Sequence, residues 1–132
     1  MKKEFIPYEL ALRMRQLGFD IPTFGYYQST RLKLQFPLLK SETQTQTYMR
    51  EEDCSAPTFQ QAFRWFREKY GLASQFSYYH VPKWGFEILE FTDIKMTPSK
   101  IVVEYSKPRT YEEAELACLE KLIEIVEQSK SE

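Results

Sequence analysis

Few side chains in this sequence could carry out covalent chemistry. The chain has one histidine, His80, and two cysteines, Cys54 and Cys118, which lie far apart and belong to no spaced Cys or His motif. A histidine-activated nucleophile needs a Ser or Cys within reach and an acid that orients the imidazole. No motif supports such a group, so we expect His80, beside Tyr78 and Tyr79, to be a structural hydrogen-bonding residue. We expect the two cysteines to be ordinary reduced thiols, although the sequence leaves a disulfide open.

Cofactor and metal sites have no better support. One His and two isolated Cys do not supply the ligands of a zinc site, so we expect no metal. The four glycines stand singly, which leaves no Gly-rich phosphate loop, and we expect no cofactor. An enzyme would need an apolar pocket with converging polar groups, which nothing in the sequence indicates. We therefore lean against an enzyme, without a decision.

Length and composition predict a single α+β domain over residues 1–132. The net charge is −1 and 16% of the residues are aromatic, so no field of the whole protein attracts nucleic acid or anionic lipid. The charge is uneven, because residues 1–40 carry seven basic and three acidic side chains. No signal peptide and no apolar run of about 18 residues is visible, so we expect a cytoplasmic protein.

The clearest element is a helix over residues 55–71. Ser55 is the expected N-cap, and Gly71 is placed for the left-handed residue that ends a helix. Three- and four-residue steps put one apolar stripe on this helix, made of Phe59, Ala62, Phe63, Phe66 and Tyr70.

Trp65 falls outside that stripe, beside Gln61, Arg64 and Lys69 on the helical wheel. One interpretation is that Trp65 packs under a neighbouring loop or sheet edge, as tryptophan usually does. The other is an exposed aromatic flanked by cations, which is the composition of a protein-interface hot spot. The candidate binding residues are therefore Gln61, Arg64, Trp65 and Lys69.

The rest of the chain gives the order α-β-β-α-β-β-β-α, which predicts an antiparallel sheet with helices packed mainly on one face. Hydrophobic periodicity, turn residues and caps place helices at 7–17 and from 110 to about 127, and strands at 23–28, 31–36, 75–81, 86–91 and 99–106. Lys83-Trp84-Gly85 is expected as a turn. Residues 40–53 are expected as a polar loop, with a short strand at 47–49.

The last helix begins at a capping box, Thr110 with Glu113. It carries a second apolar stripe, made of Leu116, Leu119, Ile123 and Val126, in addition to the stripe expected on the sheet. We favour burial of this second stripe inside the same chain. The alternative is a homodimer contact, which makes the stripe a rival to the Trp65 patch.

Two resemblances extend these expectations. From residue 55 the order helix–strand–strand–strand–helix is similar to a double-stranded-RNA-binding domain in topology. Such domains meet phosphates with a basic start to their last helix. The matching positions here are Tyr111, Glu112, Glu113 and Glu115, so RNA binding is a minority hypothesis.

The second resemblance covers most of the chain. It rests on Phe5–Leu12 with Leu17-Gly-Phe19, on Ala56–Leu72 and on Tyr111–Ile125. These segments resemble a family of small proteins of gut bacteria and their phages that has no established activity. The resemblance implies a phage or mobile-element accessory protein and carries over no catalytic residue. The leading hypothesis is thus a non-enzymatic protein-binding or assembly module that acts on a protein partner or by self-association, and the alternative is a nucleic-acid-associated module.

Overall fold

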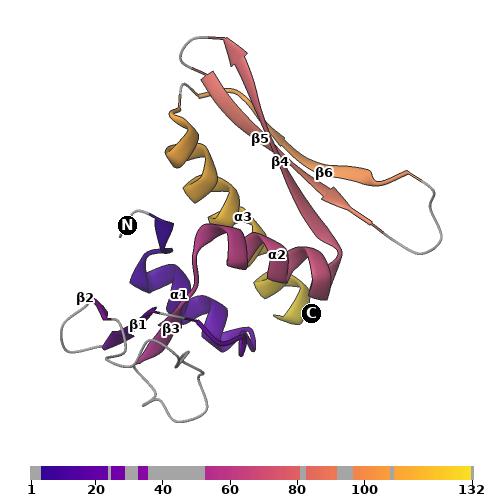
Figure 1. Ribbon diagram of the computed structural model, residues 1–132. Helices are drawn as coiled ribbons and strands as arrows, with labels where there is room; N and C mark the ends of the chain where they lie inside the picture. The colour runs from indigo at the N-terminus through magenta and orange to yellow at the C-terminus, as the bar shows by residue number, and fades with distance from the viewer. Residues whose placement is uncertain are drawn as a thin grey trace. The chain divides into compact units, whose positions relative to one another are not determined.

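Figure 1 shows the computed structural model, which describes residues 4–23, 25–28, 33–35, 53–80, 83–91, 97–107 and 109–131. The fold is α+β with antiparallel strands, as predicted. The elements, in chain order, are α1 Tyr8–Gln16, β1 Gly25–Gln28, β2 Lys33–Gln35, β3 Cys54–Ala56, α2 Phe59–Tyr70, β4 Leu72–His80, β5 Lys83–Glu90, β6 Ser99–Glu104 and α3 Tyr111–Ser131. The predicted element order is confirmed, with the three-residue strand β3 in addition. Apart from Asp53, the predicted loop at 40–53, with its short strand, lies outside the described residues.

The described strands form two sheets instead of the one expected, with the orders β2-β1-β3 and β4-β5-β6. The chain divides into two compact units, Met1–Gln61 and Ala62–Glu132, with the boundary inside the first turn of α2. The prediction of one domain therefore stays a prediction, and each unit is described by itself.

In the first unit, β1 lies between β2 and β3 and pairs with both in antiparallel fashion. The predicted hairpin of β1 and β2 is thus confirmed. The Tyr27 side chain on β1 donates a hydrogen bond to the Ile6 carbonyl oxygen at 2.7 Å and meets the Tyr8 ring edge-on at 5.6 Å. The predicted end of α1 is also confirmed, because Gly18 has a φ of 101°.

The start of α2 differs from the prediction. Ser55, expected as its N-cap, lies in β3, where it pairs with Tyr26. The helix begins instead after Thr58, whose Oγ1 accepts the Gln61 amide at 3.1 Å while the Thr58 amide donates to Gln61 Oε1 at 3.0 Å. This reciprocal pair is a capping box three residues downstream of the expected cap.

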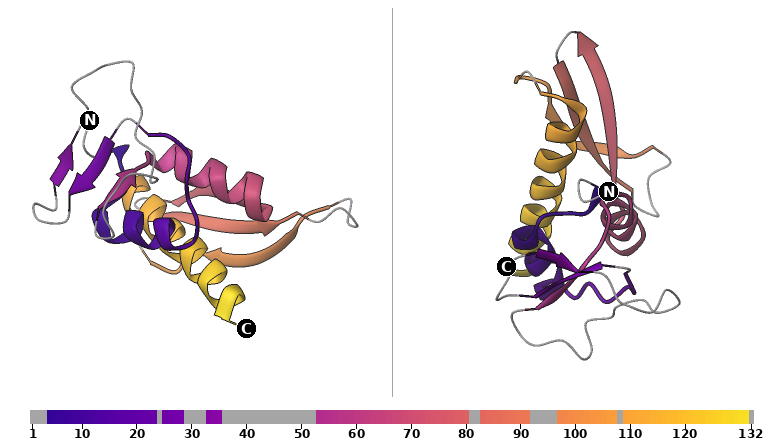
Figure 2. Two further views of the ribbon diagram at one scale, coloured as in Figure 1. Left: turned by 90° about the horizontal axis from the view of Figure 1, so that it is seen from below. Right: turned by 60° about the vertical axis from the view of Figure 1, so that its left-hand side comes forward.

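In the second unit, α3 lies along one face of the sheet β4-β5-β6 (Figure 2) and contacts β5 and β4. Phe86 and Ile88 of β5 are 3% and 0% exposed. The Phe76 ring of β4 lies 5.5 Å from Phe63 of α2 and 5.5 Å from Tyr111 of α3. Both helices of this unit therefore contact the same face of the sheet, as expected.

The strand β5 begins earlier than predicted. Lys83, Trp84 and Gly85, expected as a turn, are its first residues, and Trp84 pairs with Tyr78 across the ladder. Gly85 lies under the Tyr105 ring and beside the Glu104 carbonyl oxygen, so a Cβ at this position would collide with both. The close approach of the neighbouring strand explains why a glycine, taken as a turn signal, is found inside a strand.

The predicted capping box of α3 is confirmed. The Thr110 amide donates to Glu113 Oε1 at 2.9 Å, and the Glu113 amide donates to Thr110 Oγ1 at 3.2 Å. The hydrogen bond from the Thr110 amide, followed by one with the Thr110 side chain, holds the pKa of the Glu113 carboxyl below its usual range. The helix continues to Ser131, four residues beyond its predicted end at about 127.

The capping box makes stability depend on pH in a defined direction. Because the folded-state pKa of Glu113 is lowered, its contribution is present above the unfolded-state pKa of about 4.3 and is lost as pH falls through the folded value. We expect Glu113→Ala to be less stable than wild type at pH 7, with a difference that shrinks at pH 3. Urea unfolding at both pH values measures this difference in stability. Glu113→Gln is the control, because it keeps an acceptor that does not titrate, and an Ala difference that grew in acid would contradict the expectation.

Candidate functional site

The four predicted binding residues lie on α2, but they do not form an exposed aromatic hot spot. Trp65 is only 6% exposed, and its ring meets those of Phe66 and Tyr70 at 5.0 and 5.4 Å. The Lys69 ammonium covers this ring at 5.2 Å from its centroid, which is cation–π geometry. The interpretation of Trp65 as a packed residue therefore describes its position, and the interpretation as an exposed anchor does not.

The polar members of the predicted patch have local partners. Arg64 Nε donates to Glu68 Oε1 at 2.8 Å, and both side chains are more than 60% exposed. This ion pair raises the pKa of Arg64 and lowers that of Glu68. Gln61 serves the cap of α2. Arg64 and Lys69 remain at the surface, but the aromatic group that would supply binding energy is buried.

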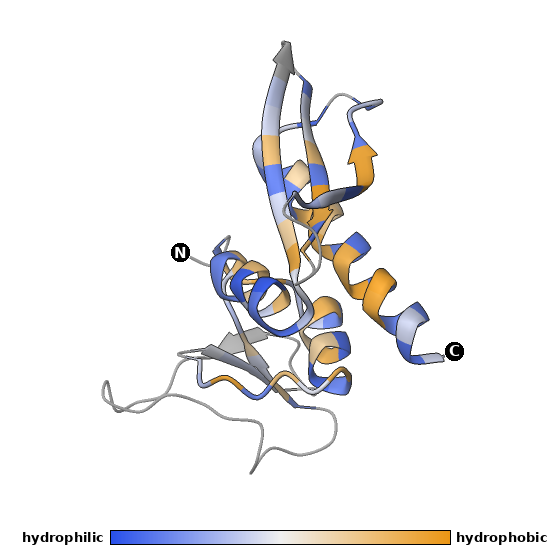
Figure 3. Cartoon of the chain, turned by 90° about the vertical axis from the view of Figure 1, so that its right-hand side faces the viewer, coloured by the Kyte–Doolittle hydropathy of each residue, from blue (hydrophilic) through white to orange (hydrophobic). Residues whose placement is uncertain are grey.

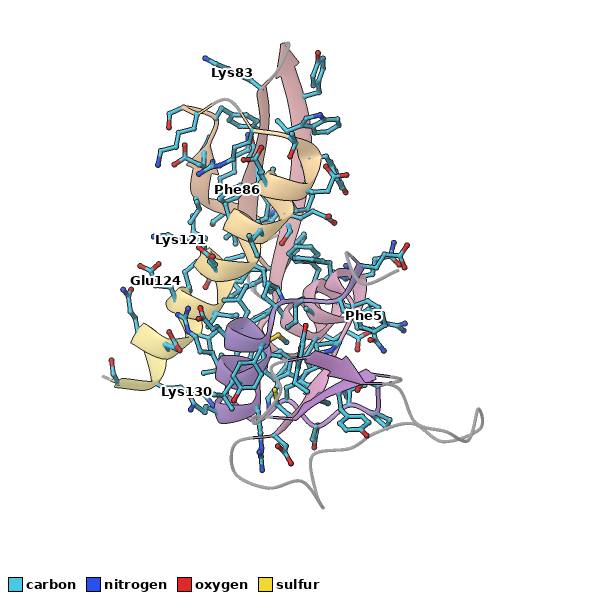
Figure 4. The ribbon with its side chains drawn as sticks, turned by 90° about the vertical axis from the view of Figure 1, so that its left-hand side faces the viewer. Phe5, Lys83, Phe86, Lys121, Glu124 and Lys130 are labelled. Atoms are coloured by element: carbon cyan, nitrogen blue, oxygen red, sulfur yellow. The ribbon has the colours of Figure 1, made fainter. Side chains whose placement is uncertain are left out.

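The second stripe of α3 is also buried. Leu119 and Ile123 are 0% exposed and Val126 is 2% exposed, so only Leu116 of this stripe is partly accessible. Figure 3 shows hydrophobic residues continuing along α3 toward its C-terminal end. Charged residues such as Lys121 and Glu124, labelled in Figure 4, form an ion pair at 3.5 Å on the accessible side of the helix. The stripe that we considered for a homodimer contact is therefore not an exposed face of this chain.

Neither thiol is placed for nucleophilic chemistry. Cys54 and Cys118 are both free and 0% exposed. Burial raises the pKa of Cys54 to about 12, and burial likewise raises that of Cys118 to about 12, despite a hydrogen bond from Cys118 Sγ to Ser74 Oγ at 3.4 Å. A thiol must ionise to attack an electrophile or bind a metal, so these positions are structural. The His80 side chain lies outside the described residues.

Sequence analysis missed an exposed aromatic cluster at the hairpin end of the second unit. The Trp84 ring lies 5.3 Å from Tyr78 of β4 and 5.0 Å, edge-on, from Tyr111 at the start of α3. Tyr78 is 49% exposed and Tyr111 is 39% exposed, whereas Trp84 is partly covered between them. We call Tyr78, Trp84 and Tyr111 the aromatic surface. Such contiguous exposed aromatic area is typical of protein interaction sites.

Three interactions hold the aromatic surface in place. The ladder pairs Tyr78 with Trp84, so their side chains share the face of the sheet that α3 covers. The Trp84 amide donates to the Arg109 carbonyl oxygen at 3.1 Å, which ties the start of β5 to the segment before α3. The capping box of Thr110 and Glu113 then fixes where α3 begins, and Tyr111 is the first residue of this helix.

The Arg109 side chain contacts two neighbours at this end of the second unit. Its guanidinium carbon lies 5.9 Å from the Phe86 ring centroid, and its Nη1 lies 4.0 Å from Glu104 Oε1. Hydrogen bonds from Ser106, followed by the charge of Arg109, lower the pKa of Glu104. Figure 4 labels Lys83 and Phe86, both on β5, and Lys83 also forms an isolated parallel bridge with Arg109. Nη1 of Arg109 is buried and has no hydrogen-bond partner among the described residues, so the ion pair with Glu104 is a long one.

The electrostatic surroundings of Tyr111 are acidic. Burial raises the pKa of its hydroxyl, and the carboxylates of Glu115 and Glu112 raise it further. Burial and the neighbouring Glu112 also raise the pKa of Glu115. Negative potential beside the exposed rings disfavours phosphate and favours neutral or cationic groups.

Comparison of the chain with protein-family models, with curated proteins and with solved structures gives no match. Among the residues that the structure describes, no group of three or more His, Cys, Asp or Glu side chains could hold a metal ion. None of the described helices combines the length and the apolar character that crossing a bilayer requires. The candidate site therefore rests on the geometry of the aromatic surface.

Burial of Trp65 predicts a stability defect on truncation. Trp65→Ala removes a buried indole and three ring or cation contacts, and such changes cost about 3–5 kcal/mol. We expect the urea midpoint to fall well below that of wild type, and we expect Trp65→Phe to recover part of the loss. Arg64→Ala, on the exposed side of the same helix, should change the midpoint little. An unaltered urea midpoint for Trp65→Ala would show that the Trp65 side chain is not buried.

The raised thiol pKa values predict protection from thiol reagents. At pH 8 a group with a pKa near 12 has roughly 10⁻⁴ of its population as thiolate, and burial also excludes the reagent. We expect native protein to react with Ellman's reagent only as slowly as it unfolds, and urea-unfolded protein to release two equivalents at once. A rapid equivalent from the native protein would show that Cys54 or Cys118 is accessible.

Proposed function

We propose that this protein is a non-enzymatic binding module whose aromatic surface captures a protein partner. The observation that carries the proposal is the contiguous contact of Tyr78, Trp84 and Tyr111, two of which are at least 39% exposed. Tyr and Trp bring large contact area with few rotatable bonds, and they dominate the energetics of many protein interfaces. The setting proposed from the resemblance, a phage or mobile-element accessory protein, agrees with a role in binding.

The rigidity of the elements that carry the aromatic surface supports this proposal. The aromatic surface is built on two paired strands and the capped end of a helix, and Gly85 and Arg109 fix the strands beneath it. A binding surface on such elements loses little conformational entropy when a partner docks. The buried thiols and the absence of a metal cluster among the described residues offer no support to a catalytic alternative.

A nucleic-acid module is the second candidate, because the second unit has the order α2-β4-β5-β6-α3 with both helices contacting one sheet face. That order is the topology of double-stranded-RNA-binding domains. The first turn of α3 is acidic, with Glu112 and Glu113, where phosphate recognition would need basic groups. We rank this candidate below protein binding for that reason.

The double variant Tyr78→Ser/Tyr111→Ser tests the proposed surface. Tyr78 is 49% and Tyr111 39% exposed, so we expect the fold to survive. We expect capture of a protein from a bacterial lysate to weaken by roughly thirtyfold, as for an interface that loses a hot spot. The matched control is Phe91→Ser, which removes a 50% exposed aromatic directly after the far end of β5. Quantitative mass spectrometry of immobilised wild type and both variants measures the retained proteins.

Two outcomes would contradict this assignment. The first is a set of retained proteins that the double variant holds as well as wild type does, which would place the contact elsewhere. The second is retardation of duplex RNA in a low-salt gel-shift titration, with no protein captured in the parallel experiment. That result would favour the nucleic-acid candidate.

A further inference from the structure

Two carboxylates border the aromatic surface on the side of α3. Glu112 follows Tyr111 directly in this helix, and Glu115 lies one helical turn further, on the same helix face as Tyr111. After burial, the charges of Glu115 and then of Glu112 raise the pKa of the Tyr111 hydroxyl, so both carboxylates act on this ring. We call Glu112 and Glu115 the acidic pair.

The acidic pair has no cation of its own in the described part of the chain. No ion pair or hydrogen bond joins either carboxylate to a described basic side chain. The Arg109 guanidinium lies over the Phe86 ring and 4.0 Å from Glu104. Lys83 (Figure 4) directly precedes Trp84 in β5, and alternation along the strand puts the two side chains on opposite faces of the sheet. The negative charge beside the rings is therefore available to a partner.

Glu115 lies in surroundings that disfavour its negative charge. Its side chain is partly buried, and burial, followed by the charge of Glu112, raises the pKa of its carboxyl. A positive group beside the acidic pair acts in the opposite direction, because it favours the charged form. Part of the desolvation of Glu115 is already present before any partner binds, so a cation that docks here meets a carboxylate that water stabilises less than usual.

The rings attract the same kind of group. The ring planes of Trp84 and Tyr111 lie at 85° and those of Tyr78 and Trp84 at 53°, so the three ring faces point in different directions. An aromatic face carries partial negative charge, and an ammonium or guanidinium group within about 6 Å of a ring centroid is attracted to it, most strongly for Trp. The ring faces and the acidic pair therefore both favour positive charge.

We propose that the partner segment held by the aromatic surface is basic, with a Lys or Arg side chain that lies against the Trp84 and Tyr111 rings and pairs with Glu112 and Glu115. This inference rests on the proposed function and narrows the partner to a cationic polypeptide. The apolar stem of such a side chain covers ring surface while its charged end reaches the carboxylates. Arg also stacks on aromatic rings and pairs with a carboxylate through two hydrogen bonds, so an arginine peptide is the sharper probe.

The test on wild type compares two peptides that differ only in charge. The probe is a short fluorescein-labelled peptide of alternating glycine and arginine, and its control carries citrulline, the neutral isostere, at each arginine position. Fluorescence anisotropy with the full chain measures both dissociation constants. We expect the arginine peptide to bind about tenfold or more tightly than the citrulline peptide. Equal binding of the two peptides, or binding of neither, overturns the inference.

Variants of the acidic pair test where the arginine peptide binds. Glu112→Gln/Glu115→Gln keeps the shape of both side chains and removes both charges, and we expect it to weaken arginine-peptide binding roughly fivefold to tenfold. The matched control is Glu120→Gln/Glu124→Gln, which makes the same change of net charge on the same helix, starting roughly 13 Å along its axis from Tyr111. We expect this control to bind as wild type does. An equal loss for both double variants would show attraction to net charge alone and would overturn the inference.

The lysate experiment separates failure of this inference from failure of the proposed function. Proteins that Tyr78→Ser/Tyr111→Ser loses and that Glu112→Gln/Glu115→Gln retains in full would leave the aromatic surface as a binding site and exclude a cationic partner. Retention of the same proteins by both double variants would contradict both proposals. Loss from both, together with the preference for the arginine peptide, is the expected result.

Discussion

The packing of α3 on β5 is the interaction on which the second unit depends. Phe86 and Ile88 on the strand, and Ala114, Cys118 and Leu122 on the helix, are at most 3% exposed. Removal of this apolar area from water stabilises the unit by roughly 25 cal/mol per Å². The same packing excludes water from the Cys118 thiol and raises its pKa, so the contact that makes the fold also removes a reactive group from chemistry.

The sequence predicted the helices closely because their signals are local. The three- and four-residue steps of apolar residues, the capping box of α3 and the glycines with positive φ at positions 18 and 71 all act within a few residues. The strand β3 was missed because it has three residues and exists only through its pairing with β1, some thirty residues away. Ser55 and Thr58 are both plausible caps locally, and only the pairing of Ser55 with Tyr26 decides between them.

The candidate site was predicted poorly for the same physical reason. The helical wheel placed Trp65 outside the main stripe, whereas the buried residues of α2 are Ala62, Trp65 and Phe66. A wheel cannot show that Phe66, Tyr70 and Lys69 close around the indole. The aromatic surface joins residues 78, 84 and 111, which no single period connects. It depends on the register of the β4–β5 ladder and on the position where α3 begins. Trp84 was read as a turn residue, and the alternation of Trp84, Phe86 and Ile88 was the signal that could have placed it in a strand.

Topology and surface chemistry favour different partners for the second unit, and the proposed function follows the surface chemistry. The order α-β-β-β-α with helices on one face is shared with double-stranded-RNA-binding domains, but a fold does not determine a function. Recognition of a duplex depends on cations that replace its counterions, and each missing contact weakens binding at physiological salt. Here the exposed rings are bordered by Glu112 and Glu115, and the Arg109 guanidinium lies over the Phe86 ring and 4.0 Å from Glu104. Carboxylates beside exposed rings disfavour phosphate without disfavouring a neutral or basic polypeptide, and the proposal of protein binding rests on that difference.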